Sequence, residues 1–88
     1  MNTNIETQLI PSPVNPSLYK DAIRIGQQVL VEQGSKAAAA MEIFKILKDE
    51  SREVVLQAFI EGANITPKGS PTYFYNVTRK LRRQKVVV

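Results

Sequence analysis

The residues best suited to chemistry lie in the stretch from Ser70 to Lys85, SPTYFYNVTRKLRRQK. Phe74, Val77 and Leu81 recur at helical spacing and are predicted to face a core. The opposite side of that helix carries a hydroxyl, a phenol, an amide and three guanidinium groups, and no carboxylate: Thr72, Tyr75, Asn76, Arg79, Arg82 and Arg83. These groups can hold phosphates and read base edges. The alternative is a solvated basic helix whose cations lie near the negative end of its own dipole.

Charge is distributed unevenly along the chain. The net charge is +4, yet residues 1–61 hold 6 basic and 8 acidic side chains, whereas residues 62–88 hold 6 basic and none acidic. Such asymmetry indicates a basic working surface attached to a nearly neutral scaffold.

The composition argues against catalysis. The chain has no Cys and no His, which excludes a disulfide framework and a Cys/His metal site. It also removes Cys and His nucleophiles and the most common general base. None of the eight carboxylates has a recognisable catalytic partner. We therefore expect no enzyme activity, no cofactor and no metal.

A length of 88 residues with 43% hydrophobic residues predicts one small globular domain with a modest core. The first ten residues have no basic start and no apolar run, so no signal peptide is expected. The longest apolar runs are too short to cross a membrane. These features predict a soluble cytoplasmic or nucleoid-associated protein without a membrane partner.

The proline-punctuated segment 1–15 is expected to be a disordered or extended arm, followed by a single helical domain at 16–88. Asn15 and Pro16 have the residue types of a helix cap and first turn, and the helix should end near Gly34. Its apolar stripe is predicted to hold Leu18, Ala22, Ile25 and Val29. Gly26 interrupts this helix, which either close packing against another helix or simple drift would explain.

Two further helices are predicted at 36–48, capped by Ser35, and at 52–62, capped by Asp49 or Ser51. The four alanines at 37–40 suit either a dimer contact or ordinary close packing within the domain, and we favour the latter.

After Gly62 the chain is predicted to turn, with Ile65 entering the core. Thr66-Pro67 competes with Ser70-Pro71 as the start of the last helix. We favour a single turn at 66–69 followed by the main helix from Pro71. The terminal residues 85–88 are too few to classify, and a frayed tail, a minimal strand or the start of a wing would each fit.

Four helices with short connections make an all-α domain. Its last two helices, from Ser51 to Arg83, resemble the generic helix-turn-helix class of DNA-binding units. Ala58 lies where that class favours a small residue and Val77 where it favours an aliphatic one. The connection at 62–69 departs from the pattern because it is longer than the usual three or four residues.

The resemblance implies a small DNA-binding protein, of the kind found among transcriptional, phage or plasmid regulators, that places its last helix in the major groove. It implies base-edge contacts from the first half of that helix: Thr72, Tyr75, Asn76 and Arg79. Phosphate contacts would come from Lys68, Ser70, Lys80, Arg82, Arg83 and Lys85. Tyr75 could instead be a partly buried aromatic, and Tyr73 is expected at the edge of the core.

Two alternatives use the same basic face. One is RNA binding, for which only Tyr73 and Tyr75 are stacking candidates. The other is a protein-interaction module, such as an inhibitor or adaptor that binds an acidic surface of a larger complex.

Homodimerisation through the helix at 16–33 or that at 36–48 would double a small DNA footprint.

Overall fold

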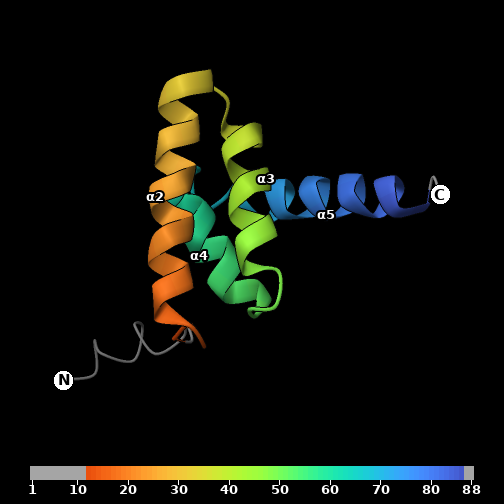
Figure 1. Cartoon of the computed structure of the whole chain (residues 1–88). Coiled ribbons are helices and arrows are strands. Elements are labelled where there is room, and N and C mark those ends of the chain that lie inside the picture. The colour runs from red at the N-terminus through yellow and green to blue at the C-terminus, as the bar shows by residue number, and fades with distance from the viewer. Residues whose placement is uncertain (1–11, 87–88) are drawn as a thin grey trace.

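The computed structural model describes residues 12–86, apart from the side chains of residues 84–86 (Figure 1). It contains four helices: α2 (Pro16–Gln33), α3 (Lys36–Leu47), α4 (Arg52–Gly62) and α5 (Ser70–Val86). No strand occurs in residues 12–86, so the predicted all-α fold is confirmed. The α5 backbone continues through Lys85 and Val86, where a short strand was one alternative, while Val87 and Val88 lie outside the described residues. None of these helices is long and apolar enough to cross a membrane.

Side-chain caps begin three of the helices at the predicted positions. The N–H of Leu18 donates to Asn15 Oδ1 at 3.2 Å, and the N–H of Ala38 donates to Ser35 Oγ at 3.1 Å. At α4 the cap is Ser51, whose Oγ accepts from the Val54 N–H at 3.3 Å. Gly34 ends α2 with a φ of 64°, the left-handed conformation that favours glycine.

The first three helices form the body of the molecule. α2 and α3 lie side by side and antiparallel, and α4 crosses behind them (Figure 1). Their shared core contains Ala22, Val29, Ile43, Val55 and Phe59, all nearly or fully buried.

The buried faces of α2 and α3 can be compared with the predicted core residues. The centre of the α2 stripe is Ala22, Gly26 and Val29 rather than the larger apolar residues, and Leu18 is 41% exposed, contrary to prediction. In α3, Ala39 and Ala40 are fully buried within the domain, as close packing predicts.

Gly26 marks the closest approach of three helices. A Cβ atom at this position would lie 2.5 Å from Ile43 Cδ1 of α3 and 2.9 Å from the Gly62 carbonyl oxygen of α4. Such distances are far inside van der Waals contact, so only glycine lets α2 approach α4 this closely. The close-packing interpretation of Gly26 is therefore correct.

The segment before α2 is tied to the body where it is described. One Glu50 carboxylate accepts the backbone N–H of Val14 and that of Asn15, both at 2.9 Å. Residues 14 and 15 of the expected arm are thus held beside the α3–α4 connection. Residues 1–11 of that arm lie outside the described residues.

Candidate nucleic-acid interface

The connection between α4 and α5 is an ordered turn. Asn64 takes a φ of 58°, and Ile65 is only 3% exposed and reaches the core, as predicted. Thr66 caps the following turn: its Oγ1 accepts from the Gly69 N–H at 3.0 Å and its carbonyl accepts from the Ser70 N–H at 2.9 Å. The predicted single turn at 66–69 is present, and it fixes the direction in which α5 leaves the body.

Ser70 does not have the role expected from the sequence. It is 1% exposed, and its hydroxyl donates to the Leu56 carbonyl of α4 at 2.9 Å. A buried hydroxyl with this partner neither caps α5 nor reaches a phosphate, so Ser70 is removed from the set of candidate contacts. It joins α5 to α4 instead, which the residue type alone could not reveal.

Aromatic packing holds the inner face of α5. The rings of Phe74 and Phe44 meet edge to face with centroids 5.9 Å apart, joining α5 to α3. Val77 is 3% exposed, and Leu81 packs against the same core, as predicted. α5 contacts α3 and α4 but not α2, and its far end stands clear of the body (Figure 1).

The opposite face of α5 is open to solvent. Its members are exposed as predicted: Thr72, Tyr75, Asn76, Arg79, Arg82 and Arg83. Tyr75 is 60% exposed, which rules out the alternative of a partly buried core aromatic. At ~100° per residue these six side chains cover about a third of the helix circumference, centred opposite Val77. We call this set the α5 outer face.

Two more predicted contacts flank the α5 outer face. Lys68 is exposed in the turn before α5, and Lys80 is exposed on the side of α5 that faces α3. The side chain of Lys85 lies outside the described residues. Thr78 is not among the predicted contacts, and its hydroxyl donates to the Phe74 and Tyr75 carbonyls of the same helix, at 2.9 and 3.0 Å.

The cations of α5 have no carboxylate partners among the described side chains. The ion pairs among the described side chains are Arg24–Asp21 at 3.5 Å in α2 and Lys45–Glu42 at 3.4 Å in α3. Arg79, Arg82 and Arg83 therefore keep their full hydrogen-bonding capacity for an external anion.

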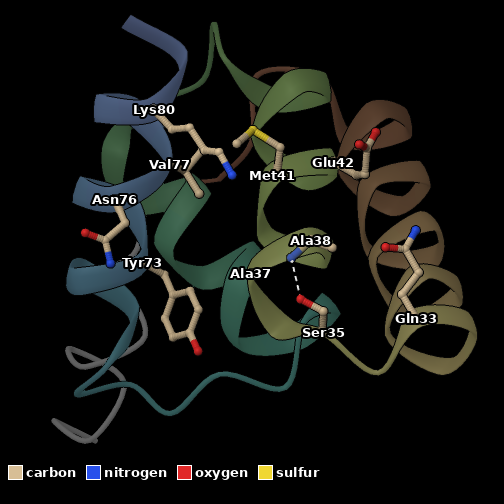
Figure 2. A pocket seen from close by; sticks show the side chains of 10 residues that line it. All are labelled: Gln33, Ser35, Ala37, Ala38, Met41, Glu42, Tyr73, Asn76, Val77 and Lys80. Atoms are coloured by element: carbon tan, nitrogen blue, oxygen red, sulfur yellow. Dashed lines mark hydrogen bonds between the residues drawn. The ribbon is translucent and has the colours of Figure 1, made fainter. Parts of the chain in front are cut away.

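A groove of about 460 Å³ runs between α3 and α5 beside the α5 outer face. Figure 2 shows Tyr73, Val77 and Lys80 of α5 facing Ala38 and Met41 of α3 across it. Apolar and polar residues both line it, and Asn76 belongs to both the groove and the α5 outer face. Tyr73 is half-buried at this edge, as expected.

One cation was missed by sequence reasoning. Arg52, the first residue of α4, places its guanidinium carbon 5.4 Å from the centroid of the Phe74 ring. In sequence the two residues are far apart, and Arg52 reads as an ordinary residue of a helix start. Only the packing of α4 against α5 brings its charge to the side of the basic helix.

Comparison of the chain with protein-family models, curated protein sequences and solved structures gives no match. Within residues 12–86 there is also no group of three or more potential metal ligands.

Proposed function

We propose that this protein binds duplex DNA through the α5 outer face. The observation that carries the proposal is a rigidly supported helix with one side buried and an opposite side that offers arginine, amide and hydroxyl groups without a carboxylate. Phosphate attracts such a surface at long range, and base edges accept or donate to its amide and guanidinium groups.

The shape of the molecule favours insertion of α5 into a groove. A helix with its side chains is about 10–12 Å wide, and the major groove of B-DNA is about 12 Å wide. α5 packs on the body through one side only, and its far end projects beyond α3 (Figure 1). The body can therefore stay outside the groove while the outer face enters it.

Base reading is assigned to the first half of α5. Asn76 would pair bidentately with adenine and Arg79 with guanine, while Tyr75 would donate to a phosphate or pack on a sugar. Thr72 lies in the same half and is exposed. Lys68, Lys80, Arg82, Arg83 and Lys85 would bind backbone phosphates and set the position of the helix.

The α4–α5 pair would act as the helix-turn-helix unit of this interface. Ala58 is fully buried and Val77 nearly so, at the positions where the class favours small and aliphatic residues. The longer turn at 63–69 is a difference from the class, and Ile65 and the Thr66 cap give it order. A homodimer would let such a unit read a two-fold site.

The proposal is tested by fluorescence anisotropy with labelled duplex DNA at several salt concentrations. We expect the logarithm of the affinity to fall steeply with the logarithm of the salt concentration, by about 0.9 for each phosphate bound. Arg79→Ala combined with Arg83→Ala should weaken binding about 10- to 100-fold. Lys20→Ala removes an exposed charge of α2 and should leave binding unchanged.

Recognition of a specific DNA sequence by α5 is tested in a separate assay. If Asn76 and Arg79 contact bases, replacing either by Ala should weaken binding to a selected duplex more than to random duplex. Equal losses on both would restrict these side chains to the backbone. Tight binding to single-stranded RNA without duplex binding would favour the RNA alternative. Absence of any nucleic-acid binding at low salt would leave the interaction with an acidic protein.

A further inference from the structure

Arg52 is the residue that extends the cationic surface from α5 onto α4. Its guanidinium lies 5.4 Å from the centre of the Phe74 ring, within the range of a cation–π contact. Phe74 itself is fixed by its edge-to-face contact with Phe44. A ring held in this way gives the long arginine side chain a preferred position on an otherwise open surface.

The hydrogen-bonding edge of this arginine is free. Arg52 is exposed, and within the part of the chain whose side chains are described it makes neither an ion pair nor a side-chain hydrogen bond. A guanidinium that lies over a ring can keep the donors on its edge for a bidentate contact with a phosphate.

The position of Phe74 on α5 places this cation beside the proposed DNA contact. Thr78 and Arg82 follow Phe74 at intervals of four residues, on the same flank of the helix. The Thr78 hydroxyl is bonded to carbonyls of its own helix, so the cations that this flank offers are Arg52 of α4 and Arg82 of α5. Eight residues of helix separate Phe74 from Arg82 by about 12 Å, enough to reach different phosphates.

No carboxylate among the described side chains forms an ion pair with Arg52. Glu50 accepts the N–H groups of Val14 and Asn15, and neither Asp49 nor Glu53 forms an ion pair with Arg52. Arg52 is the one basic residue in the stretch from Asp49 to Glu61, which also holds four carboxylates. Loss of its charge would leave this end of α4 acidic.

We propose that Arg52, held over Phe74, binds a backbone phosphate of the duplex on the side of α5 that packs against α4. Arg82 binds another phosphate, so that α4 and α5 both contact the same DNA strand. This inference rests on the proposed function of α5. It adds a phosphate contact from the supporting helix, which would fix the angle at which α5 enters the groove.

The test compares Arg52→Ala, Arg52→Lys and wild type in salt-titrated anisotropy with the same duplex. Arg52→Ala should lower affinity about three- to ten-fold and reduce the salt slope by close to one unit. Arg52→Lys should keep the slope but recover only part of the affinity, because lysine cannot make the bidentate contact. Lys20→Ala again serves as the charge-matched control.

A second variant tests whether the ring positions the arginine. Phe74→Leu keeps an apolar residue in the core but removes the aromatic face. In this background Arg52→Ala should cost a smaller factor in affinity than in wild type, whereas independent roles would give equal factors. Circular dichroism would check that each variant is folded.

The outcomes separate this inference from the proposed function. If Arg79→Ala weakens binding while Arg52→Ala leaves affinity and salt slope unchanged, DNA binding by α5 stands and the role of Arg52 is overturned. A change in thermal stability alone would make Arg52 only a packing residue between α4 and α5. If wild type does not bind duplex DNA at all, the proposed function itself fails.

Discussion

The body of α2, α3 and α4 and the outer face of α5 use polar groups in opposite ways. In the body, polar side chains bind other parts of the same chain. Glu61 accepts from the Tyr19 hydroxyl at 3.0 Å and from the Gln57 amide at 2.8 Å, and its own carbonyl accepts from Gln27. Glu50 likewise holds the chain before α2.

On the α5 outer face the polar groups have no such internal partners in the described structure. The buried side of α5 is nevertheless anchored to α3 and α4, through Ser70, Phe74 and Val77. The difference shows that the exposed arginines are not needed to hold the fold together. Without partners among the described side chains, the polar groups of the α5 outer face stay available to an external ligand.

The largest expected contrast is between a body core residue and an α5 cation. Phe59 is fully buried, so Phe59→Ala should cost about 3–5 kcal/mol of unfolding free energy, a large share of the stability of a small domain. Arg82→Ala should change stability by less than about 0.5 kcal/mol but weaken DNA binding. Urea denaturation measures the stability change of each variant, and anisotropy with labelled duplex measures the loss of binding. A large stability loss from Arg82→Ala would break the distinction between the two regions.

Ser70 tests where the boundary between the regions lies. Because its hydroxyl donates to the Leu56 carbonyl inside the molecule, Ser70→Ala should cost about 1 kcal/mol of stability. The folded variant should bind DNA with the same affinity as wild type. Thr72→Ala, two residues along on the outer face, should leave stability nearly unchanged and weaken DNA binding. Weaker DNA binding by the folded Ser70→Ala variant would return this residue to the phosphate contacts.

The smallest effect concerns a pH dependence of the body. Burial, and then the hydrogen bond and charge of Glu61, raise the pKa of Tyr19 well above its usual value. The folded state thus favours the neutral phenol, and this contribution is complete below pH ~10 and is lost as the pH rises toward the folded-state pKa. Wild type should therefore exceed Tyr19→Phe in stability at pH ~8, by about 1 kcal/mol, and less so at pH ~11.

Denaturation curves of the two proteins at both pH values provide this comparison. The other tyrosines and the lysines are shared, so their titration cancels in the difference between the proteins. A stability difference that is the same at both pH values would mean that the Tyr19–Glu61 contact does not depend on the phenolic proton.

Local signals predicted most of the fold. Asn15, Ser35 and Ser51 cap helices because a short polar side chain can satisfy the free N–H groups of the first turn, and this preference is visible in sequence. The spacing of Phe74, Val77 and Leu81 likewise defined the inner face of α5. Helical period also fixed which residues of α5 face solvent.

Contacts between distant residues could not be predicted in this way. Ser70 and Pro71 have the residue types of a helix start, but the approach of Leu56 buries the hydroxyl. Leu18 matches the apolar period of α2, yet Gly26 determines which side of that helix packs most closely. Arg52 gains its neighbour only when α4 and α5 meet.

The central claim is tested most directly by NMR, by following backbone amide shifts of the full chain as duplex DNA is added. We predict that the largest shifts fall on residues 68–83 and on Arg52, with small changes in α2. Shifts concentrated in α2, or none at low salt, would contradict the assignment of α5 as the DNA-binding surface.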